Sequence, residues 1–203
     1  EISSNEEAFQ LMLEAIEEAG YRPNEQIALG VDAAASEFYE DGKYVLRSEG
    51  KELSPREWTD KIMAWIKKYQ LWSLEDMHDE EDWKEWVYLT AQIGEKVQIV
   101  GDDLLTTNVK RIKKAIEKKA VNAVLIKLNQ IGTITETIKA IKLADSAGFT
   151  TVVSHRSGET NDDMYADLVV GTTSWQSKFG GPDRGERVAK YNRLLRIEEE
   201  LES

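Results

Sequence analysis

Apolar residues along the chain follow two periods, one typical of helices and one typical of strands. Phe9, Leu13 and Ile16 recur at helical spacing and share one face of a helix predicted over residues 5–20. Gly20 suits the end of that helix, because glycine adopts the left-handed conformation with which many helices end. The first element of the chain is therefore predicted to be an amphipathic helix.

The same pattern continues to the C-terminus. Further helices are predicted over residues 55–69, 80–94, 108–120, 133–148, 163–167 and 186–201. Strands are predicted over residues 27–34, 71–75, 97–100, 123–128, 150–153 and 168–172, and a hairpin over residues 37–46 turns at Asp41-Gly42. Two of the helix starts carry capping signals, at Ser54 and at Thr133-Ile-Thr-Glu136.

Strands that alternate with helices in this way predict a parallel sheet in a single α/β domain. The alternation alone fits a barrel and an open doubly wound sheet equally well. No Gly-x-Gly-x-x-Gly follows any predicted strand, which disfavours a dinucleotide-binding domain.

Composition excludes several classes of protein. The formal net charge of −12 disfavours binding to nucleic acid, because a negative surface repels phosphate backbones. The chain contains no cysteine, so it has neither disulfides nor thiolate metal sites, as is typical of cytoplasmic proteins. Neither an apolar signal region nor an apolar run long enough to cross a membrane is present, so no membrane association is expected.

Ionisable residues follow most of the predicted strands. These residues are Asp32, Glu75, Asp102, Lys127 and His155. Ligands of parallel α/β folds bind at the carboxyl ends of the strands, and three carboxylates there suit a hard cation such as Mg²⁺. The alternative is that polarity simply resumes where a strand ends. Five successive examples favour a functional site.

Longer motifs around these residues resemble the enolases, in order and in spacing, over nearly the whole chain. The motifs are Val31-Asp32, Ala35-Ser-Glu-Phe-Tyr39, Ser73-Leu-Glu-Asp76, Gly101-Asp-Asp-Leu104, Lys127-Leu-Asn-Gln-Ile-Gly132, Ser154-His-Arg-Ser-Gly-Glu-Thr160, and Ala189-Lys-Tyr-Asn192 with Arg196-Ile-Glu-Glu199. The resemblance implies an incomplete (β/α)8 barrel of the TIM type, with about six β-α units after a leading helix.

The resemblance also implies a reaction, the reversible dehydration of 2-phosphoglycerate to phosphoenolpyruvate with Mg²⁺. Asp32, Glu75 and Asp102 would bind the metal, and Lys127 would remove the proton next to the substrate carboxylate. Lys178 would hold that carboxylate. Arg156 and Ser157 would hold the phosphate, with His155 beside them.

The chain departs from the enolase pattern in two respects. It starts at the helix before the third barrel strand, so we expect the capping domain, the first two strands and the general acid of the site to be missing. The loop that usually reads Gly-Gln-x-Lys-Thr-Gly reads Trp175-Gln-Ser-Lys-Phe179-Gly180 here, and Trp65 and Trp72 are also unusually large.

These departures leave three hypotheses. The first is an enolase-type lyase domain with weak or incomplete activity. The second is a non-catalytic scaffold, engineered or divergent, that self-associates through Trp65, Trp72 and Trp175, with a dimer favoured because tryptophan is enriched at interfaces. The third is a small-molecule binder that uses a pocket around Trp175 and Phe179.

Overall fold

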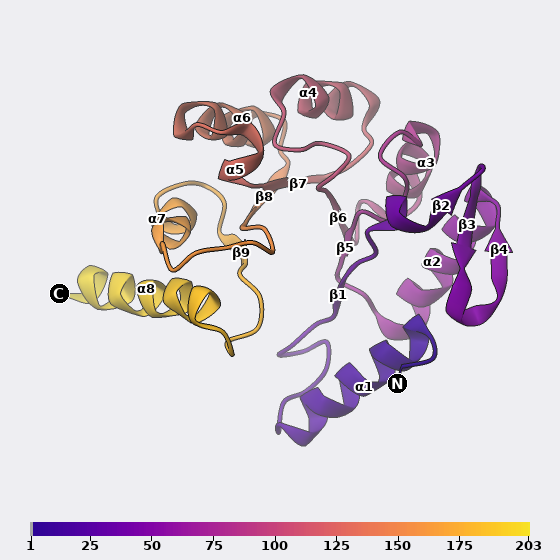
Figure 1. Cartoon of the computed structure of the whole chain (residues 1–203), viewed down its shortest axis with the longest axis horizontal. Coiled ribbons are helices and arrows are strands. Elements are labelled where there is room, and N and C mark those ends of the chain that lie inside the picture. The colour runs from indigo at the N-terminus through magenta and orange to yellow at the C-terminus, as the bar shows by residue number, and fades with distance from the viewer. Residues whose placement is uncertain (1) are drawn as a thin grey trace. The chain divides into compact units, whose positions relative to one another are not determined.

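The computed structural model describes residues 2–203. The chain falls into two compact units, the first made of residues 1–104 and 118–121 and the second of residues 105–117 and 122–203. Each unit contains a parallel three-stranded ladder with helices between the strands (Figure 1).

The first unit begins with helix α1 and ends just after strand β6. Its elements are α1 (Asn5–Glu18), β1 (Gly30–Asp32), η1 (Ala35–Phe38), β2 (Tyr39–Glu40), β3 (Lys43–Leu46), η2 (Arg47–Glu49), β4 (Lys51–Leu53), α2 (Pro55–Tyr69), β5 (Ser73–Glu75), α3 (Trp83–Ile93) and β6 (Gln98–Gly101). Strand β5 pairs in parallel with β1 on one side and β6 on the other. The antiparallel strands β2, β3 and β4 form a separate small sheet.

The second unit contains the remaining elements. These are α4 (Val109–Lys118), whose last residue is assigned to the first unit, β7 (Ala123–Ile126), α5 (Leu128–Ile131), α6 (Ile134–Ser146), β8 (Thr150–Ser154), α7 (Met164–Val170), β9 (Gln176–Lys178) and α8 (Gly185–Glu202). Strand β8 pairs in parallel with β7 and with β9. With three parallel strands in each unit, the described residues contain six β-α units, which confirms the predicted class of an incomplete (β/α)8 barrel.

One predicted strand is wrong. Residues 168–172 were expected to be the last strand, but residues 164–170 form helix α7 and the strand is β9. The apolar run Leu168-Val-Val170 is too short for its periodicity to separate a strand from a buried helix segment. Strand β9 is polar, and its pairing with β8 rather than its own residue pattern makes it a strand. The predicted hairpin also gains a third strand, β4.

Local signals account for the start of helix α2. The Ser54 side chain accepts a hydrogen bond from the Glu57 backbone N–H, and the Glu57 carboxylate accepts one from the Ser54 N–H in return. Pro55 occupies the first turn, where a missing N–H costs nothing. This capping box confirms the helix start that was predicted at Ser54.

Helix α1 packs against α2 through aromatic rings. The ring of Phe9 meets Trp65 edge-on at 5.4 Å and Tyr69 at 5.2 Å between centroids. Trp65 is 3% exposed and also meets Trp58 edge-on, so it belongs to the core of the first unit. The expectation that Trp65 contributes to an interface is corrected accordingly.

A buried polar network fixes the loop that follows β5. The ring of His78 is 1% exposed, with Nδ1 3.3 Å from the Tyr44 hydroxyl and Nε2 3.4 Å from the Thr59 hydroxyl. Trp58 donates a 2.6 Å hydrogen bond from Nε1 to the carbonyl of Met77. Burial lowers the pKa of His78 to about 3, so the ring is neutral at ordinary pH.

The two remaining unusual tryptophans are exposed. Trp72 is 53% exposed and Trp175 is 87% exposed. Trp175 also has a positive φ of 54°, a conformation in which glycine is favoured and a large side chain is strained. Glycine, the usual residue of the enolase pattern at this position, would suit that conformation.

Among the helices of the described residues, none is both long enough and apolar enough to cross a membrane.

We predict that Trp175→Gly stabilises the protein by about 0.5–1 kcal/mol. Relief of the left-handed strain gains about 1–2 kcal/mol, and the greater freedom of glycine in the unfolded chain offsets part of this gain. Trp72→Gly is the matched control. Trp72 lies in extended backbone that is bonded to Leu29 and Gln98, so its substitution should destabilise the protein. Urea denaturation measures both variants, and a loss of stability in Trp175→Gly would contradict the argument.

Candidate metal and substrate site

In the first unit, carboxylates gather at the carboxyl ends of the parallel strands. Asp32 and Glu75 are register partners at the ends of β1 and β5, and Glu75 is in turn paired with Val100 of β6. Asp102 follows β6 directly. Glu75 and Asp102 are each 7% exposed, whereas Asp32 lies at the surface. The three predicted metal ligands therefore end neighbouring strands, as expected.

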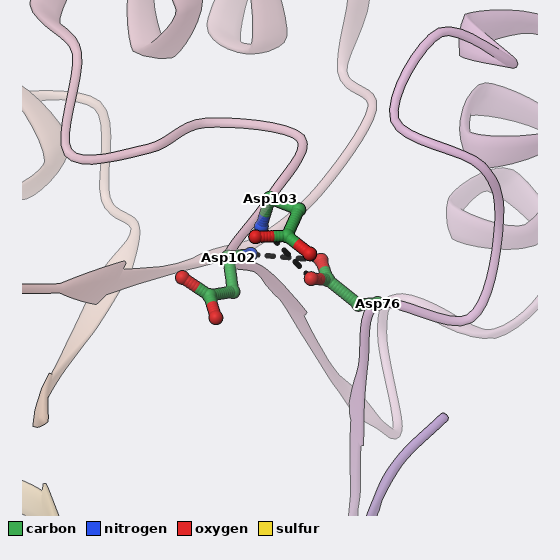
Figure 2. Close-up of side chains that lie close together, drawn as sticks. All are labelled: Asp76, Asp102 and Asp103. Atoms are coloured by element: carbon green, nitrogen blue, oxygen red, sulfur yellow. Dashed lines mark hydrogen bonds between the residues drawn. The ribbon is translucent and has the colours of Figure 1, made fainter. Parts of the chain in front are cut away.

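Asp76 ties the ends of β5 and β6 together. Its Oδ1 accepts a 2.9 Å hydrogen bond from the backbone N–H of Asp102, and its Oδ2 accepts a 2.8 Å bond from that of Asp103. Figure 2 shows the Asp76 carboxylate directed at these two backbone nitrogens, while the carboxylate of Asp102 points away from it. The backbone of Asp76 is also bonded, with its N–H donating to Val100 and its carbonyl accepting from Ala35.

Asp76, Asp102 and Asp103 form a group in which each side chain offers an oxygen within 4.8 Å of the others. Asp76 is 4% exposed, and burial raises its pKa to about 8. The charges of Asp102 and Asp103 act in the same direction, and the two backbone donors act against it. Among residues 2–203 this is the group of at least three such side chains whose ligand atoms all lie that close together, a spacing that could hold a metal ion.

The donor chemistry of this region fits Mg²⁺. All the side chains concerned offer carboxylate oxygens, the ligand type that a hard divalent cation prefers. A divalent ion would also offset the cost of holding several carboxylates close together and out of water. Of the predicted ligands, Asp102 belongs to the group of three aspartates, and Asp32 and Glu75 lie outside that group. Both oxygens of Asp76 already accept backbone bonds, which suits a residue that positions ligands better than one that binds the ion.

In the second unit, the predicted catalytic and substrate-binding residues also follow strands. Lys127 comes directly after β7, and its backbone N–H donates a 2.9 Å bond to the hydroxyl of Thr107. Ser154 at the end of β8 is the register partner of Lys178 in β9, and its hydroxyl lies 3.2 Å from the Lys178 carbonyl. Lys178 is exposed at this strand end.

The loop after β8 carries His155, Arg156 and Ser157. The His155 ring is 8% exposed and stacks on Phe179 with 6.0 Å between ring centroids, while Arg156 and Ser157 are exposed. Phe179 is 1% exposed and also meets Tyr191 edge-on. It is therefore a core residue that supports His155, and it does not form the wall of an open pocket with Trp175.

In each unit, parallel strands alternate with helices and ionisable side chains follow the carboxyl ends of the strands, which is the arrangement of a β/α barrel domain. The family model of the enolase C-terminal TIM barrel domain matches residues 1–203. The chain belongs to this family, which confirms the family resemblance drawn from its motifs.

Sequence reasoning missed two acidic residues and one cation of the site region. Asp76 and Asp103 each follow a predicted ligand immediately, and this doubling of acidic residues at two strand ends is the signal that could have revealed them. The cation is Arg187 of α8, which approaches His155 from a segment more than thirty residues away in sequence. No local pattern marks such a partner.

We predict that Asp102→Asn weakens Mg²⁺ binding by at least about tenfold in calorimetric titration, because it removes a charged oxygen ligand. Asp102 belongs both to the predicted ligands, with Asp32 and Glu75, and to the group of three aspartates, with Asp76 and Asp103. Further variants distinguish these two sets of ligands. Glu75→Gln should weaken binding as strongly, and Asp103→Asn should have little effect. Asp145→Asn, an exposed substitution on α6, is the charge-matched control. Unchanged affinity in Asp102→Asn would refute the metal site.

We also predict that the metal-free protein loses stability as pH rises from 6.5 to 8. The folded-state pKa of Asp76, about 8, is above its unfolded value, so its contribution is present at low pH and is lost as pH rises through 8. The slope should approach about 1.4 kcal/mol per pH unit. Below pH 6.5 the lowered pKa of His78 removes stability as pH falls, so the window above 6.5 isolates Asp76.

Urea denaturation across this window, with and without Mg²⁺, measures the effect. Added Mg²⁺ should flatten the slope because it stabilises the ionised carboxylates. Asp76→Asn should also remove the slope, although its stability will be lower at every pH because an amide nitrogen would face a backbone donor. If the stability of Asp76→Asn still falls with pH across this window, another group causes the pH dependence.

Proposed function

We propose that this is an enolase-type lyase domain for the Mg²⁺-assisted, reversible dehydration of 2-phosphoglycerate to phosphoenolpyruvate, with weak or incomplete activity because none of its assigned residues serves as general acid for the departing hydroxyl. The observation that carries the proposal is the match to the enolase barrel family together with the placement of acidic and basic residues at the ends of successive parallel strands. The proposed substrate is thus a small molecule that carries both a phosphate and a carboxylate. A chain with a net charge of −12 needs local cations or a metal ion to hold such an anion.

Asp32, Glu75 and Asp102 would hold the Mg²⁺ ion. When bound, the ion supplies positive charge next to the substrate carboxylate, which favours removal of a proton from the neighbouring carbon. Asp76 would keep the loop after β6 in register with the end of β5 through its two backbone bonds. Its role is to position Asp102.

Lys127 would accept the proton from the carbon next to the substrate carboxylate, in its uncharged form. The backbone N–H of Lys127 is bonded to the hydroxyl of Thr107, which in turn lies 3.0 Å from the side-chain oxygen of Gln130. These bonds fix the backbone position of Lys127 at the end of β7. Lys178 would pair with the substrate carboxylate.

Arg156 and Ser157 would bind the phosphate. An arginine guanidinium can form two parallel hydrogen bonds to a phosphate, which a point charge cannot do. Both side chains are exposed at the end of β8 and are available to an incoming anion. His155 would lie beside the phosphate, held on the ring of Phe179.

We predict that Lys127→Ala lowers the rate of proton removal by about 10²–10⁴-fold, the usual contribution of a general base. Exchange of the proton at carbon 2 of 2-phosphoglycerate with deuterium from solvent, followed by NMR with Mg²⁺ present, measures this step without requiring loss of the hydroxyl. Absorbance of phosphoenolpyruvate reports the complete reaction. Lys113→Ala, on the exposed face of α4, is the control. Equal exchange in Lys127→Ala and the unaltered protein would exclude Lys127 as the base.

A second candidate function, a scaffold that self-associates, is favoured by the exposure of Trp72 and Trp175. Large exposed aromatic side chains are typical of the centres of protein interfaces. The strain at Trp175 gives a further reason to look for a role, since the position would suit glycine better.

We predict a homodimer at micromolar concentration, about twice the 23.1 kDa mass of the chain by light scattering. Trp175→Ser and Trp72→Ser remove the apolar area that association would bury, at about 25 cal/mol per Å². At least one of these variants should therefore dissociate. A 23.1 kDa species that persists on concentration would exclude the dimer.

A further inference from the structure

We propose that Arg187 of helix α8 is a positioning residue that fixes the ring of His155 and holds the loop of residues 155–157 in its binding conformation. The part of this inference that concerns substrate rests on the proposed function, because it assigns phosphate binding to Arg156 and Ser157. The part that concerns the histidine ring is independent of that assignment.

A single guanidinium contacts all three residues of the loop. Nη1 of Arg187 lies 2.9 Å from Nε2 and 2.5 Å from Nδ1 of His155. Nη1 also donates to the carbonyl of Arg156 at 3.4 Å, and Nη2 donates to that of Ser157 at 3.1 Å. The Arg187 side chain is 11% exposed, and its contacts with the His155 ring are partly buried, whereas its bonds to the two carbonyls are exposed.

These contacts position the ring of His155. A guanidinium carries only donors, so the ring must offer it a nitrogen with a lone pair, and both ring nitrogens lie within reach of Nη1. Nδ1 also lies 2.8 Å from the carbonyl oxygen of Arg156. Stacking on Phe179 fixes the ring plane. The imidazole is thus held at both nitrogens and on one face.

The surroundings of Arg187 support its placement. A Cβ at Gly180, whose φ is 78°, would lie 3.1 Å from Cδ of Arg187, so the absence of a side chain there leaves room for the arginine stem. One turn along α8, the fully buried Lys190 donates a 2.6 Å bond to the carbonyl of Thr160 and lies 3.7 Å from the carboxylate of Glu159. Helix α8 therefore fastens both ends of the 155–160 segment.

Arg187 affects binding through the backbone of the loop. It donates hydrogen bonds to the carbonyl oxygens of Arg156 and Ser157, and the side chains of both residues are exposed. An anion can then meet a loop that is already ordered, with a further positive charge behind it. Without Arg187 the loop would have to order on binding, at a cost in affinity.

The chain contains two histidines, so selective ¹⁵N labelling of histidine gives two sets of ring signals, and His78 serves as the internal reference. Arg187→Met should shift the ring nitrogen signals of His155, because the ring loses the donor that contacts both of its nitrogens, and should broaden the backbone amide signals of residues 155–157. Arg187→Lys, which keeps one charged donor, should restore part of both. Arg193→Met is the control on the same helix, because Arg193 pairs with Asp167 and not with the loop.

Titration with inorganic phosphate, followed by the amide signals of residues 156 and 157, measures the effect on binding. Arg187→Met should raise the dissociation constant about tenfold, as is usual when a residue that orients a ligand is removed, and Arg193→Met should leave it unchanged. Unchanged ring and loop signals in Arg187→Met would overturn the proposal. If Arg187→Met does not fold, the spectra of the unaltered protein and of Arg187→Lys decide. If phosphate does not bind the unaltered protein, the phosphate role of the loop fails, while the ring signals still test Arg187.

Discussion

The arrangement of the acidic site depends on the hydrogen bonds that Asp76 makes to the backbone of the next strand end. A carboxylate buried beside two others is costly in water-poor surroundings, and its raised pKa records that cost. Two backbone N–H groups offset part of it. Because those N–H groups belong to Asp102 and Asp103, the side chain of Asp76 sets where the loop after β6 begins and therefore where Asp102 lies.

The second unit uses a cation for a similar purpose. Arg187 donates to carbonyl oxygens of the loop after β8, whereas the carboxyl group of Asp76 accepts from N–H groups of the loop after β6. Loops at strand ends leave backbone groups without ladder partners, and a charged side chain can satisfy several of them at once. In both cases a charged or ionisable side chain holds the backbone next to a predicted ligand or catalytic group.

The unusual aromatic residues divide into two groups with different physical roles. Trp65 and Phe179 are buried, one in the contact of α1 with α2 and the other beneath His155, so their size fills the interior. Trp72 and Trp175 lie at the surface, and Trp175 has a backbone conformation that disfavours a large side chain. Size alone in the sequence could not distinguish these groups, because burial depends on neighbours from distant segments.

The sequence by itself determined the features that depend on near neighbours in the chain. The alternation of strands and helices, the capping box at Ser54, the N-cap at Thr133 and the ionisable residues at successive strand ends all follow from spacings of a few residues. Only the tertiary structure decided that residues 164–170 are helical and that β9 is a strand, because pairing with β8 outweighs local preference there. It also decided that His78 is buried and neutral and that Asp76 and Arg187 hold their loops. Those outcomes come from desolvation and from contacts between segments far apart in sequence. Neither the burial of a residue nor its distant contacts can be calculated from its neighbours along the chain.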